Sequence, residues 1–324
     1  MASPDISVIF ATYNRADMLR QTLEAMTRLD LQGLNVEFVV VDNNSNDNTG
    51  QVIDSFKDRL PVVHLFEPRQ GKNRALNHAL NAVELGDIVV FTDDDVVPCE
   101  DWLHQIAACC KRWPEYSVFG GKIDPIWPKG VKIPTWARES QDLQAVVFAI
   151  HNLGDADMAY GDIPPFPFGP NFWVRRGVFS DGRRYDESIG PKPGSFRMGS
   201  ESSFLLKLAA DGFGALYTPK AAVGHHIEAK YFSGKGLVAR LIRYGRADVT
   251  QNGVNRQRLL SKNKILWYFR TLISLFISYL RMLAARLIIS KSRRAERIAL
   301  VARWRGYDLE SLKVVWQEYY NRRE

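Results

Sequence analysis

The first part of the chain alternates short apolar runs with segments in which apolar residues recur at helical spacing. The apolar runs are rich in β-branched residues and occupy residues 6–12, 36–41, 62–66 and 88–91. Helical periodicity follows the first three runs, over residues 16–29, in a segment that reaches residue 56, and over residues 71–83. Strands and helices that alternate at this spacing indicate βαβ units, and they predict an α/β fold with a mostly parallel sheet flanked by helices.

The chain after residue 100 continues the alternation with longer interruptions. The predicted helices cover residues 100–113 and 201–211, and the predicted strands cover residues 117–123, 215–219 and 221–226. Two segments rich in proline, residues 125–136 and 161–170, predict loops instead of regular elements.

A run of three carboxylates, Asp93, Asp94 and Asp95, directly follows the strand predicted at residues 88–91. In an extended segment residues two apart share a face, so Asp93 and Asp95 are expected to converge while Asp94 points away. Carboxylate oxygens at the end of a strand suit Mg²⁺ or Mn²⁺, and these metals commonly bind together with phosphates. Taken alone, the run is equally typical of a solvated acidic turn.

The neighbouring strands favour the metal site over the turn. Thr12 and Asp42 each stand at the end of a predicted parallel strand, as the three carboxylates do. Ligands of such sheets bind beyond the carboxyl ends of the strands. We therefore expect Thr12, Asp42 and the carboxylates to line one binding site.

The last part of the chain is helical in pattern and strongly basic. Residues 230–324 hold 21 Lys and Arg against six Asp and Glu, a net charge of +15, whereas the rest of the chain carries −8. The apolar stretch 266–289 is interrupted by Arg270 and Arg281, and the uncharged residues between them are too few for a span of roughly 20 residues. Arg270, Ser274, Ser278 and Arg281 fall on one helical stripe.

This pattern predicts a helix that lies on an anionic membrane surface. Packing of the helix on the body of the protein, or in an oligomer interface, is the alternative. Nucleic-acid binding is not expected, because a long apolar run fits a bilayer better than a phosphate groove. With only three cysteines and no basic N-terminal segment before the first strand, the chain is expected in the cytoplasm, peripheral on the inner face of the cell membrane.

Several motifs stand in a fixed order along the chain. They are Ile6-Ser-Val-Ile-Phe-Ala-Thr-Tyr-Asn-Arg15, Val39-Val-Val-Asp-Asn-Asn-Ser45, Phe91-Thr-Asp-Asp-Asp95, Gly169-Pro-Asn-Phe-Trp-Val-Arg-Arg176 and Gly199-Ser-Glu-Ser-Ser-Phe-Leu-Leu-Lys-Leu208. Together with the run that ends at His225-His226, they resemble the inverting family 2 glycosyltransferases of the GT-A fold. The resemblance covers roughly residues 5–228. It predicts a GT-A nucleotide-sugar glycosyltransferase domain at residues 1–228. The basic, partly amphipathic helical region at residues 229–324 lies outside the resemblance and is expected to be membrane-associated.

The resemblance implies roles for individual residues. Asp93 and Asp95 take the two acidic positions of the family's D-x-D motif and are expected to bind Mn²⁺ or Mg²⁺, with His225 as a third ligand and His226 as the alternative. The residues implied in nucleotide-sugar binding are Thr12, Tyr13, Arg15, Asp42, Lys72, Arg74, Asp93 and Asp94. Asn171 and Trp173 lie in the segment that the family carries on its acceptor side.

Glu201 falls on the position of the family's catalytic base when the chain is aligned on Phe204 and Leu208. Ser200 replaces the acidic residue that usually precedes it, and a shift of the alignment by one would put Ser202 on the base position. A second interpretation is that Glu201 only stabilises the start of its helix through the helix dipole.

These features predict a metal-dependent inverting glycosyltransferase. The donor is expected to be a nucleoside-diphosphate sugar, with UDP as the expected nucleotide, and the acceptor a hydroxyl of a polysaccharide, oligosaccharide or lipid-linked glycan. A catalytically weak or inactive nucleotide-sugar-binding scaffold is the alternative that Ser200 and Ser202 suggest. A sugar-phosphate nucleotidyltransferase would need a glycine-rich loop after the first strand, and residues 11–15 contain no glycine. The sugar, the linkage and any homo-oligomer are left open.

Overall fold

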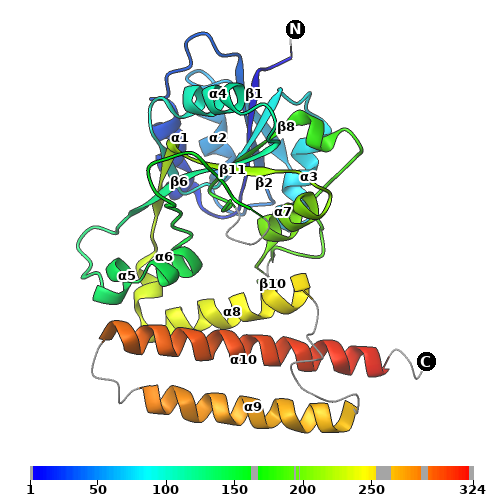
Figure 1. Ribbon diagram of the computed structural model, residues 1–324. Helices are drawn as coiled ribbons and strands as arrows, with labels where there is room; N and C mark the ends of the chain where they lie inside the picture. The colour runs from blue at the N-terminus through cyan, green and yellow to red at the C-terminus, as the bar shows by residue number, and fades with distance from the viewer. Residues whose placement is uncertain are drawn as a thin grey trace. The chain divides into compact units, whose positions relative to one another are not determined.

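The computed structural model describes residues 3–161, 167–192, 195–196, 198–252, 264–285 and 291–320 (Figure 1). The chain divides into two compact units. The sheet unit comprises Met1–Ile126, Ala149–Ser195 and Ser200–Ile227, and the helical unit comprises Trp127–Phe148, Phe196–Gly199 and Glu228–Glu324. The assignment of separate functions to residues 1–228 and 229–324 stays a prediction.

The sheet unit is built on one large sheet with the strand order β3-β2-β1-β4-β8-β6-β11-β5, and β7 pairs with β11. The strands are β1 (Ile6–Thr12), β2 (Val36–Asp42), β3 (Val62–Phe66), β4 (Ile88–Thr92), β5 (Val96–Pro98), β6 (Val118–Ile126), β7 (Met158–Ala159), β8 (Asn171–Arg175) and β11 (Ala215–His226). Two more short strands, β9 (Pro191–Lys192) and β10 (Ser195–Phe196), lie outside this sheet.

One block of the sheet is parallel and the remainder is mixed, and with the flanking helices this confirms the predicted α/β fold class. β3, β2, β1 and β4 form a parallel block, and β11 is parallel to β6. β8 runs antiparallel between β4 and β6, and β5 runs antiparallel to β11. The apolar pattern of residues 171–175 did not reveal this direction, because a strand buried on both faces looks the same whichever way it runs.

Helices cover the sheet because they present apolar stripes to it. They are α1 (Ala16–Met26), α2 (Thr49–Asp54), α3 (Lys72–Ala82), α4 (Trp102–Arg112), the short η1 (Arg176–Phe179) and α7 (Ser200–Ala210). In α3 the buried side chains include Ala75, Leu76, Ala79 and Leu80, a spacing that places them on one side of the helix. They join a core cluster with strand residues such as Phe91 and Phe172, whose rings stack at 4.9 Å between centroids.

The helical unit contains α5 (Thr135–Glu139), α6 (Gln141–Phe148), η2 (Ala229–Phe232), α8 (Gly234–Asn252), α9 (Lys264–Ala285) and α10 (Lys291–Tyr320). α10 packs against both α8 and α9 (Figure 1). Two glycines allow α8 and α10 to approach closely: a Cβ on Gly245 would lie 1.8 Å from the carbonyl oxygen of Arg303, and one on Gly306 would lie 2.0 Å from that of Ile242. No helix in the described ranges is long and apolar enough to cross a membrane.

Candidate functional site

The carboxyl ends of the central parallel strands bring the predicted residues together. Thr12 at the end of β1 pairs in register with Asp42 at the end of β2. Asp94, just beyond β4, accepts hydrogen bonds from the Thr12 hydroxyl at 2.7 Å and, through its carbonyl oxygen, from the Thr22 hydroxyl at 2.9 Å. Parallel strand register therefore places the acidic run directly beside β1.

Arg15 links two of the three carboxylates. Its Nη1 donates to Asp94 Oδ1 at 2.6 Å and its Nη2 donates to Asp95 Oδ2 at 2.8 Å. Burial raises the pKa of Asp94 to about 7, although Arg15 and Thr12 oppose the shift. Burial also acts on Asp95, but there the hydrogen bond and the charge of His225, together with Arg15, hold the pKa well below its usual range.

His225 reaches Asp95 because β5 and β11 are paired. In this antiparallel pair Val96 lies opposite His225, and the backbone nitrogen of His226 donates to the Asp95 carbonyl oxygen at 2.9 Å. His225 Nε2 then lies 3.2 Å from Asp95 Oδ1, and both side chains are largely buried. Of the two neighbouring histidines, His225 is the one whose ring contacts the acidic run. Burial lowers the pKa of His226.

The imidazole nitrogen of His225 and the carboxylate oxygen of Asp95 are donors that suit Mn²⁺ or Mg²⁺. Both atoms converge at 3.2 Å, while Arg15 occupies the other carboxylate oxygen of Asp95, Oδ2. The same ranges contain no group of three His, Cys, Asp or Glu side chains gathered tightly enough to hold a metal. The Asp93 carboxylate instead accepts a hydrogen bond from Lys72. The residues present therefore fit two protein ligands, and a set of three with Asp93 stays a prediction.

Lys72 is the partner of Asp93, and it also reaches Glu201. Its Nζ donates to Asp93 Oδ1 at 2.6 Å and contacts Glu201 Oε1, and all three side chains are mostly buried. Burial alone would lower the pKa of Lys72, but the two carboxylates hold it well above its ordinary value. One ammonium group thus connects the acidic run after β4 with the first turn of α7.

Glu201 is also enclosed from the side of the loop before β8. A Cβ on Gly169 would lie 2.8 Å from Glu201 Oε1. A side chain at this position would require the Glu201 carboxylate to shift, so the Gly169 motif and the Glu201 motif meet in space although they are separated in sequence. The structure therefore places Glu201 at the same site as Asp93.

The position of Lys72 depends on the segment that connects β3 to α3. Asn43 Nδ2 donates to the carbonyl oxygens of Glu67 at 3.1 Å and Arg69 at 3.0 Å, and its Oδ1 accepts from the Gly71 nitrogen at 2.7 Å. Gly71 has φ of +142°, which L side chains rarely adopt. Asn43 belongs to the motif at residues 39–45, but that motif alone does not predict that Asn43 holds this segment.

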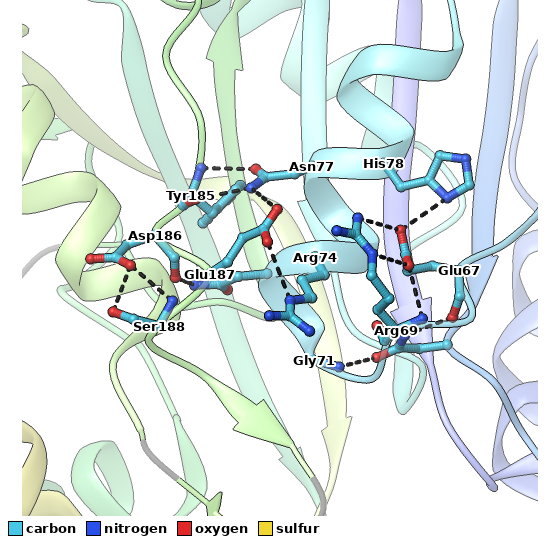
Figure 2. A network of polar contacts seen from close by, with 12 residues as sticks. Glu67, Arg69, Gly71, Arg74, Asn77, His78, Tyr185, Asp186, Glu187 and Ser188 are labelled. Atoms are coloured by element: carbon cyan, nitrogen blue, oxygen red, sulfur yellow. Dashed lines mark hydrogen bonds and ion pairs between the residues drawn. The ribbon is translucent and has the colours of Figure 1, made fainter.

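A network of polar contacts ties α3 to the segment that precedes α7 (Figure 2). Asn77 Nδ2 donates to the Tyr185 carbonyl oxygen and Asn77 Oδ1 accepts from the Tyr185 nitrogen, both at 2.9 Å. Arg74 Nε donates to Glu187 Oε2 at 3.2 Å, so Arg74 points toward Glu187 in this structure. The predicted role of Arg74 in nucleotide binding stays a prediction.

Tyr185 was not singled out from the sequence, since it lies in a loop with no motif. Its ring stacks on Phe204 of α7 at 4.5 Å and meets Phe91 of β4 edge-on at 5.5 Å. Burial, with the charges of Glu201 and Asp93, raises the pKa of its hydroxyl well above the usual value. Tyr185 therefore packs α7 onto the strand that carries the acidic run.

The remaining predicted residues lie near this site or inside the sheet. Asp42 is buried, and its Oδ1 accepts a hydrogen bond from the Ser45 nitrogen at 2.9 Å; Tyr13 is half-buried. Asn171 is buried, donating to the Lys122 and Ala221 carbonyl oxygens and accepting from Trp102 Nε1. Trp173 is buried and stacks on Phe119 at 5.7 Å. The acceptor-side role of Asn171 and Trp173 stays a prediction.

Comparison with known proteins gives a consistent result. A family model described as Glycosyl transferase family 2 matches residues 7–183. Glycosyltransferase AglE of Haloferax volcanii is 28% identical over 245 residues, which cover 72% of this chain and 73% of that protein. The GalNAc(5)-diNAcBac-PP-undecaprenol beta-1,3-glucosyltransferase of Campylobacter jejuni is 33% identical over 95 residues, 28% of this chain and 30% of that protein. In several relatives the matched segment spans less than a third of the relative's own length.

Among solved structures, the chain is similar to that of the mannosyltransferase PcManGT from Pyrobaculum calidifontis in complex with GDP-Man and Mn²⁺. The TM-score is 0.62 at 18% sequence identity, over 96% of this chain and 88% of that one. At this identity the likeness concerns the fold alone, and it confirms the predicted GT-A-type architecture.

Proposed function

The chain belongs to glycosyl transferase family 2, and from this premise we propose that it transfers a sugar from a nucleoside-diphosphate sugar to a hydroxyl group of a glycan or lipid-linked glycan. The observation that carries the proposal is the meeting of three distant segments at the end of β4. There the acidic run, Glu201 and His225 lie within one set of direct contacts. AglE and the Campylobacter jejuni enzyme are described as glycosyltransferases, which supports the same reaction class.

We assign donor binding to the carboxyl ends of β1, β2 and β4. We assign Thr12, Tyr13, Arg15 and Asp42 to the nucleoside side of the donor, since Thr12 and Arg15 both contact the acidic run. Lys72 supplies positive charge close to that run. Asp95 and His225, with Asp93, would hold Mn²⁺ or Mg²⁺. When bound, such an ion neutralises the charge that develops on the departing diphosphate.

Glu201 is proposed as the general base of an inverting transfer. The acceptor hydroxyl gives its proton to the Glu201 carboxylate, its oxygen forms the new bond to the anomeric carbon, and the bond from that carbon to the diphosphate oxygen breaks. Lys72 donates a hydrogen bond to the same carboxylate. The rival interpretation of a non-catalytic scaffold predicts donor binding without turnover.

The helical unit offers support for the proposed membrane association. On α9, Thr271 and Ser278 are buried, and the Ser274 hydroxyl donates to Asp308 Oδ2 of α10 at 2.6 Å. The small polar side of α9 therefore packs on α10. The large apolar side chains of the helix point outward instead and are exposed: Leu272, Ile273, Phe276, Ile277, Leu280 and Leu283.

An outward apolar face on a basic helical segment is typical of a helix that lies in a membrane interface. We place this face on an anionic bilayer, with the enzyme peripheral to the membrane on its cytoplasmic side. The side chain of Arg270 lies outside the described set, so its part in the predicted polar stripe stays a prediction.

Donor binding is tested by a thermal-shift screen of UDP- and GDP-sugars with and without Mn²⁺. A specific donor raises the unfolding midpoint because it binds only the folded state. With that donor, slow hydrolysis should depend on Mn²⁺ and should be lost in Asp95→Ala. Asp58→Ala, which removes an exposed carboxylate elsewhere, should behave as the unmodified protein. Hydrolysis that survives Asp95→Ala would refute the metal assignment.

A further inference from the structure

The helical unit contains a cavity of about 780 Å³ that the catalytic proposal does not use. Residues from α5, η2, α8, α9 and α10 line it. Much of the lining is apolar and includes Trp136, Phe232, Leu237, Val238, Met282 and Ile298. A cavity of this size and lining fits a hydrocarbon chain or a ring system.

The charged residues of the cavity have one sign. Lys235 from α8 and Arg294 and Arg305 from α10 all line it, and among its described lining residues there is no Asp or Glu. Such a surface favours an anionic group, and the planar guanidinium of arginine binds phosphate oxygens in pairs. The ligand class that matches both parts of the lining is an amphiphile with a phosphate headgroup.

The cavity is continuous with the outward apolar face of α9. Tyr279 and Leu283 line the cavity and are also 50% and 39% exposed. A lipid held in a bilayer against this face has an apolar route into the cavity. The exposed apolar face of α9 and the cationic cavity therefore form one surface.

We infer that this cavity binds the lipid diphosphate of a lipid-linked acceptor, with the hydrocarbon chain against Trp136 and Leu237 and the phosphates at Lys235, Arg294 and Arg305. The inference rests on the proposed transfer to a lipid-linked glycan and names the part of the chain that holds the lipid. It requires no change in the assignments of donor and base residues.

The test is calorimetric titration of the full chain with farnesyl diphosphate, below its micelle concentration and without any nucleotide sugar. Saturable binding is expected, with farnesol and inorganic pyrophosphate each at least about tenfold weaker, because each lacks one half of the ligand. Arg294→Gln should weaken farnesyl diphosphate binding about tenfold. Arg297→Gln, an exposed arginine one turn away that does not line the cavity, should leave it unchanged.

Lys235→Gln provides a second variant at an exposed position, where loss of folding is not expected, and it should also weaken binding. Equal binding by Arg294→Gln, Lys235→Gln and Arg297→Gln would overturn the inference, as would farnesol binding as tightly as farnesyl diphosphate. Donor hydrolysis is measured separately on the same preparations. If the transferase proposal is wrong, the natural protein binds farnesyl diphosphate but does not hydrolyse the donor. If this inference is wrong, the natural protein hydrolyses the donor but does not bind farnesyl diphosphate.

Discussion

At the scale of single residues, Lys72 joins the acidic run to the proposed base. Its ammonium group stands between Asp93 and Glu201, two carboxylates that would otherwise repel each other in a mostly buried environment. Arg15 does the same for Asp94 and Asp95. Each cation thus lies between two acidic groups and offsets their mutual repulsion at the site proposed for the donor.

A buried histidine away from this site gives the stability of the fold a defined pH dependence. His151 is 2% exposed, lies 2.5 Å from the Tyr160 hydroxyl through Nε2, and has its pKa lowered by burial to about 4. The unfolded chain therefore binds a proton at higher pH than the folded chain. The contribution of neutral His151 to the free energy of unfolding is complete above the ordinary histidine pKa of about 6.5. It is lost as the pH falls toward 4.

We predict that lowering the pH from 7.5 to 5 reduces the free energy of unfolding by about 2 kcal/mol through His151 alone. Urea unfolding at both pH values, on the natural protein and on His151→Gln, isolates this contribution, since all other titrating groups are shared. The variant should show a pH dependence smaller by that amount. An equal dependence in both proteins would mean that His151 is protonated in the folded state.

The motifs predicted which segments meet, but not how the acidic run is oriented. His225 lies beside Asp95 as expected. The structure differs from the expected convergence of Asp93 and Asp95, because Arg15 joins Asp95 to Asp94 while Asp93 contacts Lys72. Contacts between residues remote in sequence could not be predicted: nothing near Lys72 indicates that one ammonium group would join Asp93 to Glu201, and nothing near Tyr185 indicates its packing on Phe204. Such contacts depend on how loops of the folded chain return to the sheet.

At the scale of elements, the start of α3 controls where Lys72 lies. The helix begins immediately after Gly71, whose φ of +142° is strained for any residue with a side chain. The nearest atoms to a Cβ at this position belong to Arg74 at 3.8 Å, so space is not limiting. The backbone conformation alone requires glycine here.

Gly71→Ala is therefore predicted to lower the free energy of unfolding by about 1–2 kcal/mol and to weaken donor binding, because relaxation of the strain moves Lys72. Urea unfolding and donor titration measure the two effects. Gly177→Ala is the matched control, since a Cβ there meets nothing within 4 Å and no positive φ is present. If Gly71→Ala binds the donor as tightly as Gly177→Ala, the start of α3 does not position the site.

Elements with a clear period were predicted closely, and those set by long-range pairing were not. The helix predicted at residues 71–83 is α3, Lys72–Ala82, whereas the helix predicted to reach residue 29 ends at Met26. The two strands predicted at 215–219 and 221–226 form one strand, β11, with a register shift between Thr218 and Ala222. Pairing with β6 keeps this strand continuous across Pro219, which the sequence alone marks as an interruption.

At the scale of the whole molecule, the basic helical segment has an orientation that the sequence did not settle. Its composition predicted either membrane contact or packing within the protein. The structure shows packing within the protein, because the small polar side of α9 packs on α10; the apolar side is exposed, and its contact with a membrane stays a proposal. Side-chain periodicity defines the two sides of a helix, but only the position of α10 decides which of them is covered.

We predict that Ile273→Asp combined with Phe276→Asp lowers binding to phosphatidylglycerol vesicles about tenfold or more, since each variant puts a charge on the face proposed to enter the membrane. Co-sedimentation with the vesicles at moderate salt measures this binding. Phe66→Asp, at an aromatic residue of the sheet unit that is 51% exposed, should leave binding unchanged. Unchanged co-sedimentation of the double variant would exclude this face as the membrane contact.

The most direct test of the central claim is sugar transfer by Glu201→Gln compared with Ser202→Ala, using the donor found by thermal shift. Glutamine keeps the shape of the side chain but cannot accept the acceptor proton. We predict that Glu201→Gln lowers kcat about a hundredfold or more while the donor Kd changes far less, and that Ser202→Ala stays near the natural rate. A natural rate in Glu201→Gln, or a large loss in Ser202→Ala, would contradict it.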